Sequence, residues 1–210
     1  MEEKINPEFA MNPDPRCACI LLLDTSASMA GKRISELNEG LRTFEEELRQ
    51  DLLASRRVEV GIVTFGDGGV NKIQDFVTAA QFTAPSLSAG GNTPMGRAID
   101  IALDMVRERK AEYKRSGVGY YQPWIFLITD GAPADSWQEA ARRSQQEMEA
   151  NTLTLFAVGV AGADMEVLNQ LTPRTLKLDG LRFRNCSYGY RKVKNVFPAA
   201  DPATRQRFLL

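Results

Sequence analysis

The sequence predicts a single α/β domain in which helices cover both faces of a mostly parallel sheet. Short segments that are apolar throughout alternate with segments whose apolar residues recur at helical spacing. Strands that are buried on both faces and separated by helices are typical of parallel sheets. A chain of 210 residues is long enough for one such three-layer domain with a sizeable core.

The first half of the chain predicts three strands and one helix. Residues 17–24 (CACILLLD) form an apolar run that ends in an acid, as expected of a buried strand. From Ile34 to Leu48, apolar residues recur at steps of three and four, which is one face of a helix. Residues 57–66 (RVEVGIVTFG) and 72–77 (KIQDFV) are strand-like and are joined by a short Gly-rich segment. That join predicts a hairpin, and hence an antiparallel edge strand.

The second half predicts three further helices and three further strands. The helix at residues 136–150 should begin at an N-cap formed by Asp135 or Ser136. The other helices are expected at residues 94–110 and 163–171, and the strands at residues 123–130, 152–160 and 175–178.

Oxygen-bearing side chains follow two of the predicted strands and precede one helix. The set comprises Asp24, Ser26, Ser28, Thr93 and Asp130, which we call the oxygen cluster. Ligands in open α/β sheets bind beyond the carboxyl ends of the strands, so we expect these side chains to converge there. Two carboxylates and three hydroxyls suit Mg²⁺, with Mn²⁺ or Ca²⁺ as alternatives. Such a site is under-neutralised and should attract an anion, most simply an Asp or Glu of a partner protein.

The oxygen cluster resembles the metal-ion-dependent adhesion site of von Willebrand factor type A (vWA) domains. The family motif Asp-x-Ser-x-Ser falls on Asp24, Ser26 and Ser28, the separate Thr on Thr93, and the late Asp on Asp130. The resemblance implies a Rossmann-like fold with strand order 3-2-1-4-5-6 and one antiparallel edge strand. It also implies that the three hydroxyls ligate the metal, Thr93 directly or through water. The two carboxylates would act mainly through water and hydrogen bonds.

One position departs from the family pattern, since Ala27 stands where the family commonly has Gly. The extra methyl group should remove no ligand, although it is expected to tighten the turn.

Within the family, the chain most resembles the bacterial tellurite-resistance type (TerY-like). Stretches such as PRCACILLLDTSASM, GGNTPMGRAI and YYQPWIFLITDGAPAD carry this likeness, and the resemblance to the vWA family as a whole spans roughly Pro15 to Phe183. The TerY-like likeness implies a cytoplasmic, non-enzymatic binding module of a tellurite-resistance or stress-response system. The partner would present an Asp or Glu, and a protein kinase or PP2C-type phosphatase of the same operon is a candidate.

Other interpretations stay open at this stage. Asp24 and the serines suit a plain turn, and Thr93 suits a cap for the helix near Pro94. A Mg²⁺-dependent phosphohydrolase with Asp24 as nucleophile is the alternative function, and a scaffold that has lost its metal is a third. Cys17 and Cys19 are either small core residues or one edge of a zinc site.

Composition excludes several classes of function. The chain has no histidine, which excludes His-based triads and imidazole zinc ligands. A formal net charge of −1 gives no general attraction to nucleic acid or to an anionic membrane. We see no apolar run long enough to span a membrane and no apolar signal core, so we expect a cytoplasmic protein with reduced cysteines.

We expect a flexible leader at residues 1–14, a vWA domain at 15–184 and an atypical tail at 185–210. The tail has no helical stripe where the fold calls for a final covering helix. We interpret this break as a frameshifted or otherwise altered C-terminus, with a natural divergent tail as the alternative. An altered tail would leave an apolar patch uncovered.

Overall fold

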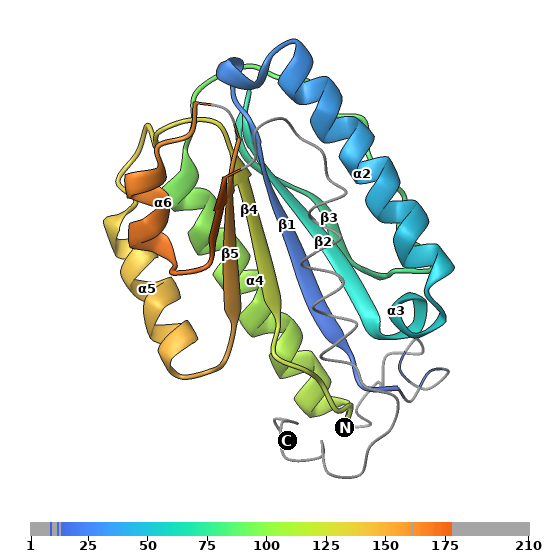
Figure 1. Ribbon diagram of the computed structural model, residues 1–210. Coiled ribbons are helices and arrows are strands. Elements are labelled where there is room, and N and C mark those ends of the chain that lie inside the picture. Colours follow the sequence, from blue (N-terminus) through green and yellow to red (C-terminus); the bar gives the residue numbers. More distant parts are fainter. Residues whose placement is uncertain (1–8, 10–11, 13, 161, 178–210) are drawn as a thin grey trace.

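The computed structural model describes residues 9, 12, 14–160 and 162–177 (Figure 1). The expected tail at residues 185–210 and most of the expected leader at residues 1–14 lie outside these residues.

One six-stranded sheet forms the centre of the described domain, with strand order β3-β2-β1-β4-β5-β6 (Figure 1). The strands are β1 (Cys17–Thr25), β2 (Val58–Gly66), β3 (Gly69–Thr78), β4 (Trp124–Thr129), β5 (Thr154–Gly159) and β6 (Thr175–Lys177). Only β3 runs antiparallel to its neighbour within this sheet. The predicted fold class, strand order and edge hairpin are therefore confirmed.

The helices connect these strands and cover both faces of the sheet. They are the 3-10 turn η1 (Ala27–Met29), α2 (Lys32–Gln50), α3 (Leu52–Arg57), α4 (Met95–Arg115), α5 (Gln138–Glu149) and α6 (Met165–Leu171). The helix α3 is not predicted by the sequence pattern, because six residues are too few to show helical periodicity. Its N-cap is Asp51, whose carboxylate accepts from the N–H groups of Leu53 and Ala54. None of the helices in the described residues is long and apolar enough to cross a membrane.

Alternate side chains of β1 serve two separate cores. Ile20 and Leu22 pack in the cluster that includes α4, α5 and α6, whereas Leu21 and Leu23 pack in the cluster that includes α2 and α3. All four are buried, since successive side chains of a central strand point to opposite, helix-covered faces. This two-sided burial holds β1 in place at the centre of the sheet (Figure 1).

The predicted N-cap of α5 is wrong. The N-cap residue is Trp137, and no side chain caps this helix. The carboxylate of Asp135 instead accepts from the backbone N–H groups of Gly96 and Arg97, at 2.9 Å each, and so caps α4. The two segments meet closely, since a Cβ on Gly96 would lie 2.5 Å from the carbonyl oxygen of Ser136. Asp135, which local sequence predicts to cap α5, therefore caps the start of α4.

Cys17 and Cys19 are buried core residues with free thiols, as one of the two interpretations expected. Burial raises the pKa of Cys17 to about 12 and that of Cys19 well above its usual range. No group of three or more His, Cys, Asp or Glu side chains suited to a metal occurs among the described residues. The zinc interpretation therefore has no support in that part of the chain.

A buried ionic network lies at the start of β2, away from the oxygen cluster. Glu59 is fully buried and accepts from the Arg109 Nε at 2.7 Å and from the Tyr113 hydroxyl, and Arg16 Nε lies 3.6 Å from its other oxygen. Burial raises the pKa of Tyr113, and the negative charge of Glu59 raises it further. Burial alone would lower the pKa of Arg109, but the hydrogen bond and charge of Glu59 outweigh it and raise that pKa.

We expect Glu59→Ala to lower the free energy of unfolding by about 3–5 kcal/mol, because the buried guanidinium groups of Arg16 and Arg109 lose the buried carboxylate that they share. Equilibrium urea unfolding measures this, with Glu46→Ala, an exposed site on α2, as the matched control. A loss no greater than that of the control would show that the network does not stabilise this end of the sheet.

Candidate metal centre

The oxygen cluster forms at the carboxyl ends of two neighbouring strands. β1 and β4 pair in parallel, with Leu23 opposite Ile128. The residues that follow this pair are Asp24 on one strand and Thr129 on the other, so Asp24 and Asp130 come to the same edge of the sheet.

Asp24 is fully buried and both of its carboxylate oxygens accept hydrogen bonds. Oδ1 accepts from the backbone N–H of Ser26 at 2.8 Å, and Oδ2 from the Thr129 hydroxyl at 2.5 Å. Burial raises the pKa of Asp24, while these hydrogen bonds act in the opposite direction. Asp24 therefore ties the turn after β1 to the end of β4.

Three further members of the cluster form a continuous chain of polar contacts. The hydroxyl oxygens of Ser26 and Ser28 lie 3.0 Å apart, and the Ser28 hydroxyl donates to Asp130 Oδ1 at 2.7 Å. Ser26 and Asp130 are buried, whereas Ser28 is exposed. The chain therefore runs from the interior to the surface.

Thr93 reaches the cluster on a loop that hydrogen-bonds to the turn after β1. The Gly90 N–H donates to the Thr25 carbonyl at 2.8 Å, and the Ala27 N–H donates to the Gly91 carbonyl at 3.0 Å. A Cβ on Gly131 would lie 3.7 Å from Ser28 Oγ and 3.8 Å from Thr93 Oγ1, so both hydroxyls border the same small space.

The interpretation of Thr93 as a helix cap is wrong. The N-cap of α4 is Pro94, without a side-chain cap bond, and Asp135 binds the free N–H groups of that helix.

Two residues of this site were missed by the sequence analysis. Thr129 holds Asp24, and the only signal for it was its place beside Asp130 at a strand end. Arg33 donates from Nη1 to Asp130 Oδ2 at 2.8 Å and to the Ser28 carbonyl at 2.7 Å. Nothing in local sequence distinguishes Arg33 from the other basic residues of α2.

The donor set of the site consists of hard oxygens. The hydroxyls of Ser26, Ser28 and Thr93 and the carboxylate of Asp130 are the groups that a hard divalent cation prefers. Asp24 holds the turn that carries the serines, because it accepts from the Ser26 N–H and is itself held by the Thr129 hydroxyl.

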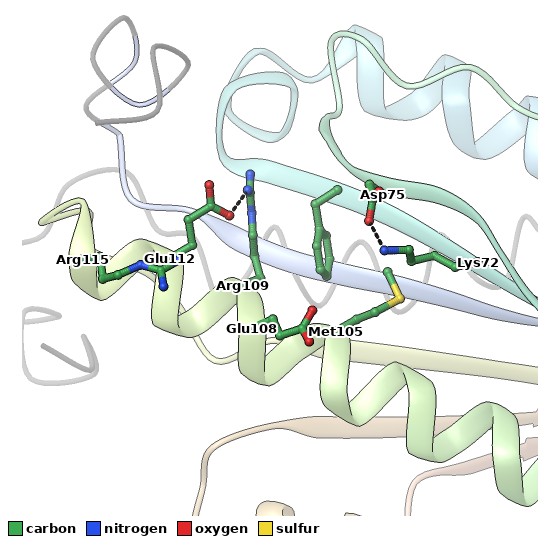
Figure 2. A pocket seen from close by; sticks show the side chains of 8 residues that line it. Lys72, Asp75, Met105, Glu108, Arg109, Glu112 and Arg115 are labelled. Atoms are coloured by element: carbon green, nitrogen blue, oxygen red, sulfur yellow. Dashed lines mark hydrogen bonds and ion pairs between the residues drawn. The ribbon is translucent and has the colours of Figure 1, made fainter. Parts of the chain in front are cut away.

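The pocket in Figure 2 belongs to another part of the molecule. It has a volume of about 380 Å³ and lies between β3 and the second half of α4, roughly 20 Å along that helix from the end nearest Thr93. Three basic and three acidic side chains line it, of which Lys72 pairs with Asp75 at 2.7 Å and Arg109 with Glu112 at 2.6 Å. The lining therefore has no excess charge of one sign to select a ligand.

Comparison with known proteins places the fold in a known family. A family model described as the von Willebrand factor type A domain matches residues 19–193. The human collagen alpha-1(XXI) chain is 25% identical over 175 residues, covering 77% of this chain and 16% of that protein. This chain thus spans about one sixth of the length of that curated relative.

Solved structures resemble this chain in fold. The pilus adhesin SpaC from Lactobacillus rhamnosus GG, in its open conformation, superimposes with a TM-score of 0.67 at 14% identity, over 88% of this chain and 30% of that one. The vWF domain of the type V pili tip protein Mfa5 from Porphyromonas gingivalis superimposes with a TM-score of 0.65 at 10% identity, over 90% and 98% of the two chains. At these identities the likeness is one of fold.

Gly91 is the residue that allows the Thr93 loop to approach the sheet. Its φ is +70°, and a Cβ there would lie 2.8 Å from the Gly66 carbonyl oxygen and from the Asp67 Cα. We expect Gly91→Ala to cost about 3 kcal/mol of unfolding free energy, through backbone strain and overpacking together. Urea unfolding measures the cost.

Gly69→Ala is the matched control for this variant. Gly69 has a φ of +91° but has nothing within 4 Å of its Cβ position, so its substitution should cost only the backbone strain of about 1 kcal/mol. Equal losses in the two variants would show that the close approach at Gly91 does not matter.

Proposed function

Since this chain belongs to the von Willebrand factor type A family, whose domains commonly serve in protein–protein interaction and adhesion, we propose that it is a divalent-cation-dependent protein-binding module. The proposed cation is Mg²⁺, and the proposed ligand of the loaded site is an Asp or Glu of a partner protein.

The observation that carries this proposal is the spacing of the Ser26 and Ser28 hydroxyl oxygens. They lie 3.0 Å apart. Neighbouring ligands of an octahedral Mg²⁺, each about 2.1 Å from the ion, are separated by about 3 Å. This is also an ordinary O–H···O hydrogen-bond distance, so the spacing is compatible with two adjacent magnesium ligands and the residues present fit the ion.

Each member of the oxygen cluster has a role in this proposal. Ser26, Ser28 and Thr93 would hold the ion through their hydroxyls. Asp130 would orient Ser28, because it accepts a hydrogen bond from the Ser28 hydroxyl at 2.7 Å. Asp24 would hold the backbone of Ser26, whose N–H donates to it. The bound ion supplies a positive charge at the surface for a carboxylate to meet.

The exposure of Ser28 supports an opening toward a partner. Asp24 and Asp130 are buried, and Ser28 is the exposed member of the contact chain. A partner carboxylate would therefore approach from the side of Ser28. SpaC, which shares this fold, is a pilus adhesin, and this is consistent with a binding role for this chain.

We further propose that the partner belongs to a bacterial tellurite-resistance or stress-response system in the cytoplasm. The support is the resemblance of stretches such as GGNTPMGRAI and YYQPWIFLITDGAPAD to the TerY-like type. A protein kinase or a PP2C-type phosphatase of the same operon is the candidate partner.

The geometry of Asp24 argues against the phosphohydrolase alternative. A carboxylate nucleophile needs a free oxygen facing the substrate. Asp24 is fully buried, and its oxygens accept from the Ser26 N–H and the Thr129 hydroxyl. We therefore keep binding as the function.

We expect Mg²⁺ to bind the chelator-treated protein at one site, and we expect Asp130→Ala and Ser26→Ala to weaken that binding at least tenfold, because each removes a ligand or its support. Isothermal titration calorimetry with Mg²⁺, Mn²⁺ and Ca²⁺ measures the affinities and ranks the ions.

Ser35→Ala, at an exposed position on α2, is the control for the serine variant and should bind like the wild type. Binding that persists unchanged in Asp130→Ala and Ser26→Ala would place the ion elsewhere. Absence of binding by all three ions would contradict the proposed function.

We expect no turnover of a generic phosphate monoester above the buffer background in the presence of Mg²⁺. A spectrophotometric assay of the purified protein tests this. Turnover that disappears in Asp24→Asn would reverse the ranking of the two functions.

A further inference from the structure

We propose that Arg33 is a tethered cation that competes with the divalent ion for the negative charge of Asp130, and thereby sets the ion concentration at which the site fills. This inference concerns the same site and rests on the proposed function. It is based on the contacts of Arg33, a side chain that does not belong to the oxygen cluster.

The guanidinium of Arg33 lies against the part of the oxygen cluster that opens to the surface. Its Nη1 donates to Asp130 Oδ2 at 2.8 Å and to the Ser28 carbonyl at 2.7 Å. The other oxygen of Asp130 accepts from the Ser28 hydroxyl. Both oxygens of this carboxylate are thus engaged, one by a ligand of the proposed ion and one by a fixed positive charge.

The ion pair satisfies Asp130 when no metal is bound. The Asp130 side chain is fully buried, and burial of a carboxylate is costly unless it is paired and hydrogen-bonded. Arg33 provides the cation, and Ser28 provides the hydrogen bond. The oxygen cluster therefore has its charge partly balanced before any ion arrives.

A divalent ion that binds beside Ser28 lies close to the positive charge of the Arg33 guanidinium. Two cations that share one carboxylate repel each other, and the repulsion is strong where the surroundings are partly buried. Asp24 and Asp130 bring two negative charges to the site, and Arg33 neutralises one of them. Metal affinity should therefore be lower than the two carboxylates alone would give.

The Arg33 side chain is also free enough to move away from Asp130. This side chain is 39% exposed, in contrast to the buried Arg109 that pairs with Glu59. It belongs to the first turn of α2, which begins at Lys32. A cation there faces the positive end of the helix dipole, so the helix itself does not hold it. Asp130 and the Ser28 carbonyl hold the guanidinium. An ion bound beside Ser28 draws on the charge of Asp130 and weakens one of these attachments.

Isothermal titration of Mg²⁺ into four chelator-treated proteins tests the proposal: the wild type, Arg33→Gln, Arg33→Lys and Arg42→Gln. Gln keeps a hydrogen-bond donor and removes the charge, whereas Lys keeps the charge. Arg42 is exposed on the same helix, so Arg42→Gln makes the same charge change away from the site. We expect Arg33→Gln to bind Mg²⁺ about tenfold more tightly than the wild type. Arg33→Lys and Arg42→Gln should stay within about threefold of the wild type.

Thermal unfolding gives a second readout that does not depend on a partner. Without Mg²⁺, Arg33→Gln should unfold at a lower temperature than the wild type, because Asp130 has lost its cation. Saturating Mg²⁺ should raise its unfolding temperature by more than it raises that of the wild type. This pattern also verifies that the variant is folded.

The outcomes separate this inference from the proposed function. If the wild type binds Mg²⁺ and a folded Arg33→Gln binds it no more tightly, the inference is overturned and the proposed function stands. If only Arg33→Gln binds, the inference is supported in its strongest form. If neither protein binds Mg²⁺, the proposed function and the inference both fail.

Discussion

The parallel pairing of β1 with β4 is the contact on which the candidate site depends. It sets Leu23 opposite Ile128, and the chain then brings Asp24 beside Thr129 and Ser28 beside Asp130. Side chains alternate along a strand, so a slip of one residue would turn one set of these groups to the other face. β1 is buried between two helical layers, with Ile20 and Leu22 in one core and Leu21 and Leu23 in the other.

Backbone hydrogen bonds bring the loop that carries Thr93 to the groups placed by the strand register. The loop with Gly90 and Gly91 hydrogen-bonds to the turn after β1, and its approach is too close for a Cβ at Gly91. These backbone contacts place Thr93 beside the turn after β1. A site whose donors are held by rigid strands and backbone bonds needs little rearrangement when it binds, which favours affinity.

Charged side chains are arranged differently at the two ends of the parallel strands. Near the start of the strands, Glu59 is closed in by Arg16, Arg109 and Tyr113, and the whole group is buried. At the carboxyl ends, Asp130 pairs with the partly exposed Arg33 and lies next to the exposed Ser28. The first arrangement is suited to stability, since its members are almost completely shielded from solvent. The second is suited to exchange, because the cation that pairs with the carboxylate is itself partly exposed.

The amino-acid sequence by itself determined the alternation of strands and helices, the edge hairpin and the positions of the five oxygen-bearing residues at element ends. These are local properties, because periodicity, turn residues and strand ends are visible within short windows. Strand order came from the family resemblance. Only the tertiary structure decided that Asp135 caps α4 and not α5, that Thr129 holds Asp24 and that Arg33 binds Asp130. Each of these contacts joins segments that are remote in sequence or depends on which of several similar side chains meets a carboxylate, and such choices are made by packing.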